Sequence, residues 1–163
     1  TPEDKGYPTV LELLTEERLS AEQRGRFSPK HLSGLGVAGR LDVDSKGLMI
    51  LSQDGTVIRK IIGPDARMEK EYLVRVQNAP TREQLQKLRH GLELDGEKLR
   101  PAKVEVLKPE LVRFILTQGK KRQIRRMCEL VGLEVQKLKR VRIGKVRLGT
   151  LPEGQWQYIR EIS

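Results

Sequence analysis

The chain has 163 residues, which is enough for one compact domain with a buried core and a cleft. Its single cysteine excludes an internal disulfide, and two widely separated histidines, His31 and His90, give no basis for a zinc site. No apolar stretch is long enough to cross a bilayer, and no secretory signal is visible near the first residue.

The charge is strongly positive, with 32 Lys and Arg residues against 22 Asp and Glu residues and a net charge of +10. Such an excess favours a polyanionic partner, because each phosphate that is neutralised releases condensed counterions. Charge alone does not separate RNA from DNA or from an anionic membrane. The lone cysteine suits a reducing compartment, so we expect a soluble cytoplasmic protein.

The first half of the chain predicts a few short elements. Residues 8–14 predict a turn into a short helix with Thr9 as its cap. Residues 22–36 are polar, basic and glycine-containing, which predicts a mobile surface loop. Residues 48–52 predict a buried strand, and residues 56–62 predict a short helix that a Gly-Pro pair ends.

The middle of the chain predicts a strand, a helix and a hairpin. The strand covers residues 71–76 and carries Tyr72 on the same face as two valines. A capping box that begins at Thr81 opens a helix reaching Gly91. The pair Asp95-Gly96 between short apolar runs is a hairpin signal for residues 92–99.

The last part of the chain alternates strands with one helix. Residues 103–107 and 111–117 predict paired strands, residues 121–131 a basic helix, and residues 137–146 a basic strand. Hairpins interleaved with isolated helices predict an α+β domain, with a mixed, largely antiparallel β-sheet and flanking helices.

One loop combines acidic and basic groups between two glycines, immediately before the predicted buried strand. It covers residues 39–48 and contains Asp42 and Asp44. A loop anchored in this way is a good place for a catalytic group, and a nearby arginine would keep a partly desolvated carboxylate ionised. The alternative is that either aspartate only caps a turn, and the residues by themselves favour this simpler role.

Two stretches are strongly basic. In residues 119–127 a glycine turn precedes a helix start, where free amides and the helix dipole favour an anion. Residues 137–147 alternate basic with apolar side chains, which predicts a strand with one basic face. A solvated charged surface is the alternative for each stretch, but two such surfaces favour nucleic acid. The candidate RNA contacts are Lys120, Lys121, Arg122, Arg126, Lys139, Arg140 and Arg142.

Aromatic residues are scarce, at 4%, so a broad platform for base stacking is not expected. Tyr72 could stack on a single extruded base, although core packing from a strand is an equal alternative. Trp156 and Tyr158 are expected in the core or at a sheet edge.

Three stretches, in this order, resemble the motifs of the pseudouridine synthases, and most closely the RsuA-type branch that modifies ribosomal RNA in bacteria. They are Gly-Arg-Leu-Asp-x-Asp-Ser-x-Gly-Leu at 39–48, Lys-Glu-Tyr-Leu-Val at 70–74 and Gly-Lys-Lys-Arg-Gln-Ile-Arg-Arg-Met at 119–127. The tail at 138–154 is also similar to this branch. The resemblance implies the pseudouridine synthase fold with a central active-site cleft, and isomerisation of uridine in RNA without cofactor or metal.

The resemblance also implies roles at the matching positions. Asp42 is the essential carboxylate and pairs with Arg125, while Tyr72 stacks on the target uracil. Ile124 packs against the flipped base, and Arg40 holds the flipped nucleotide or fills its place in the RNA. Asp42 could be a nucleophile towards the sugar or the base, or a base that takes a ribose proton, and the sequence leaves these open.

The expected partner is ribosomal RNA, specifically the 23S RNA of the large subunit, because the third motif and the tail most resemble that subgroup. A transfer-RNA pseudouridine synthase and a non-catalytic ribosomal-RNA-binding or ribosome assembly protein are the alternatives. We expect a monomer with no membrane partner. Members of this branch often carry an N-terminal S4 domain and a strand with a Lys-Pro-x-Gly pattern, so residues 1–163 are expected to be the catalytic domain without these parts.

Overall fold

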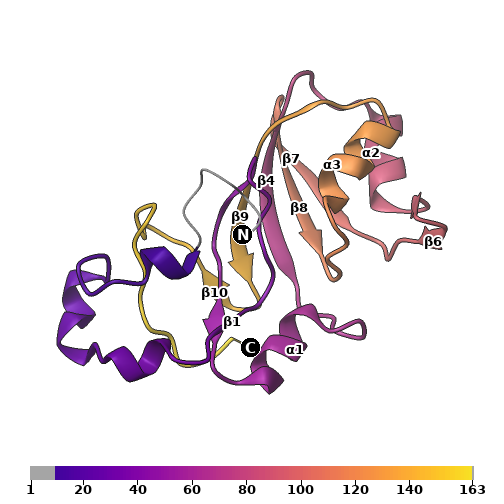
Figure 1. The fold of residues 1–163 in the computed structure, drawn as a ribbon. Helices are drawn as coiled ribbons and strands as arrows, with labels where there is room; N and C mark the ends of the chain where they lie inside the picture. The colour runs from indigo at the N-terminus through magenta and orange to yellow at the C-terminus, as the bar shows by residue number, and fades with distance from the viewer. Residues whose placement is uncertain (1–9, 163) are drawn as a thin grey trace.

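A six-stranded sheet forms the centre of the computed structural model, which describes residues 10–162 (Figure 1). Five strands follow the order β10-β9-β4-β8-β7, and β2 pairs with β9 outside this path. All pairs are antiparallel except β2 with β9, so the predicted mixed, largely antiparallel sheet is confirmed. The strands are β2 (Lys46–Gly47), β4 (Lys70–Val76), β7 (Lys103–Lys108), β8 (Leu111–Leu116), β9 (Val135–Ile143) and β10 (Val146–Arg147).

Two helices, α2 (Arg82–Arg89) and α3 (Gln123–Leu130), cover one face of this sheet (Figure 1). Between them lies the larger hydrophobic core, in which Val74, Phe114 and Met127 are almost completely buried. The predicted capping box is present at the start of α2. Together with the sheet, these helices confirm the α+β class.

A second, smaller core lies around α1 (Gly55–Ile62) and the two-stranded sheet of β1 (Gly36–Val37) and β3 (Leu51–Ser52). It buries Ile50 and Ile61 with three other apolar side chains. The helix predicted over residues 56–62 is confirmed. Within residues 10–162 no helix has the length and apolar character of a membrane span.

The predicted strand at residues 48–52 is divided in the structure. The Leu48 amide donates to the Arg140 carbonyl on β9 at 2.8 Å, whereas the Ile50 carbonyl accepts from the Ala38 amide at 2.8 Å. The chain therefore passes from one sheet to the other, and both apolar side chains are buried at the crossing. Burial was predicted correctly, but one continuous strand was wrong.

Two turns depend on backbone conformations with positive φ. The predicted hairpin is present as β5 (Glu93–Leu94) and β6 (Glu97–Lys98), with φ of 56° at Asp95 and 79° at Gly96. The single strand predicted over residues 137–146 is wrong, because Gly144, with φ of 58°, turns the chain from β9 into β10.

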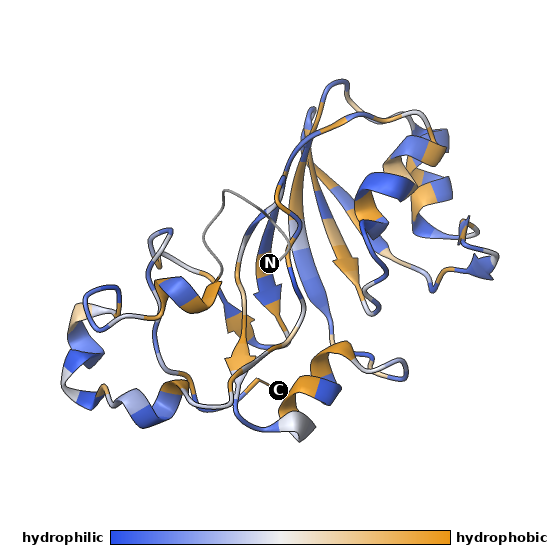
Figure 2. Ribbon diagram, viewed as in Figure 1, coloured by the Kyte–Doolittle hydropathy of each residue, from blue (hydrophilic) through white to orange (hydrophobic). Residues whose placement is uncertain are grey.

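Short 3-10 helices lie on a projection beside the C-terminal segment (Figure 1). They are η1 (Val10–Leu13), η2 (Ala21–Arg26) and η3 (Pro29–Leu32). The first falls in the segment predicted as a short helix, and the other two are in the region of residues 22–36, which was predicted as a mobile loop. The projection is mostly hydrophilic compared with the strands of the central sheet (Figure 2). Thr9, the predicted cap, lies outside the described residues.

Hydrogen bonds to the C-terminal aromatic residues hold this projection. The Gln23 side chain accepts from the Tyr158 amide at 2.6 Å, and the His31 ring lies 2.8 Å from the Tyr158 hydroxyl. The Trp156 indole donates to the Thr15 carbonyl at 2.8 Å. Trp156 forms an isolated β-bridge with Leu19, which agrees with a position at a strand edge, whereas Tyr158 packs on the projection in edge contacts.

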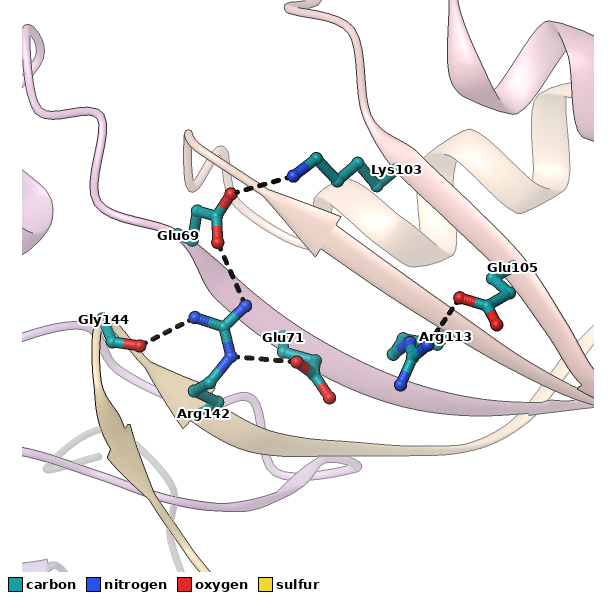
Figure 3. A network of polar contacts seen from close by, with 7 residues as sticks. All are labelled: Glu69, Glu71, Lys103, Glu105, Arg113, Arg142 and Gly144. Carbon is teal, nitrogen blue, oxygen red and sulfur yellow. Dashed lines mark hydrogen bonds and ion pairs between the residues drawn. The ribbon is translucent and has the colours of Figure 1, made fainter.

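The sheet face opposite α2 and α3 carries a network of ion pairs (Figure 3). Arg142 donates to Glu71 at 2.9 Å, to Glu69 at 3.1 Å and to the Gly144 carbonyl at 2.7 Å. Only 12% of the Arg142 side chain is exposed. Arg142, predicted as an RNA contact, is therefore engaged within the sheet.

Candidate active site

A cleft of about 1240 Å³ lies where the two cores meet. All three sequence motifs contribute to its lining. The loop before β2 provides Asp42, β4 provides Tyr72, and the start of α3 provides Ile124 and Arg125. The segments that carry these side chains are far apart in sequence, and the central sheet brings them to one place.

The loop that carries Asp42 is anchored at both ends by one arginine of β9. Arg140 is only 3% exposed, and its guanidinium donates to the Gly39 and Leu48 carbonyls, at 2.8 Å each. Arg140, predicted as an RNA contact, thus lines the cleft from within the fold. Its two hydrogen bonds fix the ends of the loop, and the Ser45 amide closes a turn on the Asp42 carbonyl at 2.9 Å.

The same loop approaches β9 so closely that one position excludes a side chain. Gly47 pairs with Arg140 in the only parallel pairing within the described part of the sheet, and its φ is 124°. A Cβ at Gly47 would lie 2.1 Å from the Arg140 carbonyl oxygen. This glycine therefore lets the loop run directly against the strand.

The two aspartates of the loop have different surroundings. Asp44 accepts hydrogen bonds from Arg122 on both carboxylate oxygens, at 3.0 and 2.9 Å, and its backbone carbonyl accepts from Arg125 at 2.6 Å. The Arg122 hydrogen bond, aided by the charges of Arg125 and Arg122 and opposed by desolvation, holds the pKa of Asp44 below its usual value. Asp42 has one ion pair, with its carboxylate 3.6 Å from Arg122. The oxygens of Asp42 are therefore more available for chemistry than those of Asp44.

This arrangement corrects the implied pairing of Asp42 with Arg125. In the part of the chain that the structure describes, the carboxylate that Arg125 contacts is that of Asp44, at 3.5 Å. Arg122 is the residue that reaches both aspartates. It does so because the helix predicted from residue 121 begins only at Gln123, and Arg122 has a left-handed conformation with φ of 52°.

Several basic side chains in and beside the cleft are paired with acidic ones. Lys120 contacts Glu97 at 2.7 Å and Arg126 contacts Asp95 at 2.6 Å, so the β5–β6 hairpin faces this part of the chain. Arg40, Lys120, Lys121 and Arg122 line the cleft, whereas Arg126 lies outside its lining. The basic surface is thus less charged than the sequence alone indicates.

Lys139 does not lie with these residues. On β9 the side chains of Leu138 and Arg140 line the cleft, and Lys139, between them, faces the other side of the sheet. Lys139, predicted as an RNA contact, therefore lies on the same sheet face as Arg142, away from the cleft.

Lys70 belongs to the second motif, and no role was predicted for it from the sequence. Lys70 is 4% exposed, lines the cleft and precedes Tyr72 by two residues, so the two side chains share one face of β4. Burial, together with the charges of Arg140 and Arg100, lowers the pKa of Lys70 to about 8. The spacing from Tyr72 was the signal that could have identified Lys70 as a cleft residue.

Among residues 10–162, no set of three or more acidic, His or Cys side chains forms a metal site.

The depressed pKa of Asp44 predicts how acid changes stability. Because the folded state favours ionised Asp44, this group contributes stability above its ordinary pKa of 3.8 and loses it as the pH falls through the lower folded value. Asp44→Asn should therefore be less stable than wild type at pH 7, with a smaller difference at pH 3. Urea denaturation at both pH values measures it, with the exposed Asp65→Asn as control. A difference that grows on acidification would contradict the assigned role of the Arg122 contact.

The model of one family, the RNA pseudouridylate synthases, matches residues 4–130. That range is most of the chain and includes the loop with Asp42, β4 and α3, whereas β9 lies beyond it. The chain therefore belongs to the RNA pseudouridylate synthase family, and the family predicted from the three motifs is confirmed.

Several named relatives are similar to the chain. An uncharacterized RNA pseudouridine synthase of Aquifex aeolicus is 36% identical over 99% of this chain and 63% of its own length. The dual-specificity RNA pseudouridine synthase RluF of Escherichia coli is 43% identical over 73% of this chain and 41% of its own length. The ribosomal large subunit pseudouridine synthase E of Vibrio parahaemolyticus is 39% identical over 76% of this chain and 59% of its own length.

A crystal structure of a pseudouridylate synthase superposes on 93% of this chain with a TM-score of 0.77 and 32% identity. The chain covers 61% of that structure, and less than two thirds of each of the three relatives.

Proposed function

We propose that this chain converts a uridine in RNA into pseudouridine, with Asp42 as the reacting carboxylate. The observation that carries the proposal is the convergence of Asp42, Tyr72 and Ile124 in one cleft, where the carboxylate oxygens of Asp42 are little used by the fold. Family membership supports the reaction, and the net charge of +10 supports a nucleic acid substrate.

The reaction needs a uridine that has left its helix or loop, because a stacked base does not expose its glycosidic bond to a protein carboxylate. We propose that the uracil stacks on Tyr72 and packs against Ile124, while Arg40 contacts the flipped nucleotide. The bond between C1′ and N1 breaks, the uracil turns, and C1′ bonds to C5. The hydrogen on C5 leaves as a proton and N1 gains one, so the product is an isomer of the substrate and needs no oxidant or donor.

Asp42 has three possible roles in this sequence. It could attack C1′, add to the ring at C6, or take a proton from the ribose. Each requires an ionised carboxylate beside the nucleotide, and the Asp42 carboxylate lies 3.6 Å from the Arg122 guanidinium. Arg125, through its bond to the Asp44 carbonyl, is proposed to hold the loop in place for the reaction.

The proposed RNA contacts outside the base site are the basic residues beside the cleft. Phosphates would compete with Glu97 and Asp95 for Lys120 and Arg126, and Lys121 and Arg122 would contribute from the cleft lining. Because these contacts are made to phosphates of the RNA backbone, they position the RNA but do not recognise its sequence.

We propose large-subunit ribosomal RNA as the substrate, since the name of the Vibrio relative assigns it to the large ribosomal subunit. The test uses purified protein with transcripts of large-subunit, small-subunit and transfer RNA, each labelled with tritium at C5 of uridine. Release of tritium to water from the large-subunit transcript alone is the expected result. Release from transfer RNA alone would reassign the substrate, and binding without release from any transcript would support the non-catalytic alternative.

A further inference from the structure

Lys70 is a buried charge at the floor of the cleft. It is the first residue of β4, where its backbone lies between Leu116 on β8 and Ile143 on β9. Its side chain is 4% exposed but contributes to the cleft lining beside Tyr72. Side chains two residues apart on a strand lie about 6.5–7 Å from each other along it. A ring held by Tyr72 is therefore within reach of the Lys70 ammonium.

No hydrogen bond or ion pair within residues 10–162 engages the Lys70 Nζ. The charged groups that act on it, Arg100 and Arg140, are cations. Each of these arginines is engaged by backbone carbonyls rather than by a carboxylate. Arg140 donates to the Gly39 and Leu48 carbonyls, and Arg100 donates to the carbonyls of residues 64, 66 and 117.

The Lys70 side chain is almost completely buried and reaches the cleft, so an acceptor that enters the cleft would compensate for the desolvation of its charge. Lys70, Arg100 and Arg140 are neighbouring cations without a carboxylate partner in the described part of the chain. Their combined charge favours the binding of a hydrogen-bond acceptor from a substrate. Phosphates of bound RNA are an unfavourable match for Lys70, since they remain near the surface, where Lys120 and Lys121 are available. The edge of a base that has entered the cleft can reach the floor.

We propose that Lys70 donates a hydrogen bond to a carbonyl oxygen of the flipped uracil and stabilises the negative charge that develops on the ring. This inference rests on the proposed function. When the bond between C1′ and N1 breaks, its electron pair passes to the uracil, and the charge spreads to the ring oxygens. Addition of Asp42 to C6 would also place charge on a carbonyl oxygen. In either case Lys70 keeps its proton and acts as a fixed electrostatic donor.

Lys70→Met separates this role from a structural one. Methionine fills a similar volume without a charge, so the variant should melt at or above the wild-type temperature. The single-turnover rate of tritium release should fall about 100- to 1,000-fold, the usual loss when one such donor is removed. Binding of the RNA should change little. The matched control is Lys87→Met on the exposed side of α2, which should match wild type in activity.

Lys70→Arg gives a second readout, the dependence of rate on pH. With a pKa of about 8, Lys70 is charged below this pH, and the wild-type rate should fall as the pH rises through it. Arginine keeps its charge, so that variant should lack this fall while retaining any decline that arises from the RNA itself. A wild-type profile without the fall would overturn the inference.

The outcomes distinguish the two proposals. If wild type releases tritium and Lys70→Met does so at the same rate, the role of Lys70 is overturned while the proposed function stands. The role of Lys70 is also overturned if the rate of Lys70→Met falls only in proportion to the amount of folded protein that is lost. If wild type releases no tritium from any RNA, the proposed function fails and the role of Lys70 fails with it.

Discussion

Asp42→Asn should lower the single-turnover rate of tritium release by at least about 10⁴-fold, a loss of the size seen when a group that takes part in bond making is removed. Asparagine has nearly the same shape but is neither a nucleophile nor a base at neutral pH. Asp42 makes one ion pair of 3.6 Å, so the fold should tolerate the change. RNA binding should stay close to that of wild type, which a filter-binding measurement can show.

The matched control for this variant is Asp44→Asn in the same loop. Asp44 contacts Arg122 and Arg125 but is not proposed to react, so its loss should affect positioning and reduce the rate by about 10-fold to 100-fold, less than the loss expected for Asp42. If Asp44→Asn were the inactive variant and Asp42→Asn were active, the reacting carboxylate would have to be reassigned. Equal activity of Asp42→Asn and wild type would remove Asp42 from the chemistry.

Gly47→Ala should damage both stability and activity. The added Cβ would meet the Arg140 carbonyl oxygen at 2.1 Å, and the φ of 124° is itself unfavourable for a residue with a side chain. The backbone conformation alone costs on the order of 1–3 kcal/mol. Relief of the clash would move the loop away from β9 and shift Asp42, and a displacement of about 1 Å at a reacting group costs about 10²-fold in rate.

Thermal denaturation and tritium release measure the two effects. For a domain of this size, 1 kcal/mol corresponds to about 2–4 °C in melting temperature, so a fall of several degrees is expected. Gly25→Ala is the control, because a Cβ there meets no atom within 4 Å. A Gly47→Ala protein with the stability and rate of wild type would mean that the contact between this loop and β9 is unimportant.

Elements specified by local sequence were predicted well. The capping box at Thr81 and the Asp95-Gly96 turn each satisfy their hydrogen bonds within a few residues, so their patterns are sufficient. The break in residues 48–52 was not predictable in this way. It exists because β2 and β3 pair with different partners, β9 and β1, and that choice depends on residues distant in the sequence.

Charged residues in strands were the main source of error. An alternating pattern of basic and apolar side chains predicts a basic solvated face, whether or not acidic or carbonyl partners lie opposite. Arg142 meets Glu69 and Glu71, and Arg140 meets two backbone carbonyls, so neither is exposed. These partners are visible only once the strands are placed in register.

In the site, too, the features that depend on local sequence motifs were predicted, and those that depend on the conformation of distant residues were not. The order of the motifs was enough to predict the family, and the residues it implied for base binding, Tyr72 and Ile124, do line one cleft with Asp42. The ion-pair partner of Asp42 was not predictable. It depends on the left-handed conformation of Arg122, the residue before α3, which brings this side chain to both aspartates.

The most direct test of the proposed reaction is the composition of the RNA before and after incubation with the protein. Complete digestion to nucleosides, followed by chromatography and mass measurement, should show uridine converted to pseudouridine with no change in mass. Wild type should form pseudouridine in large-subunit ribosomal RNA, and Asp42→Asn should form none. RNA that keeps all of its uridine with active, folded wild-type protein, or a product of altered mass, would contradict isomerisation at this cleft.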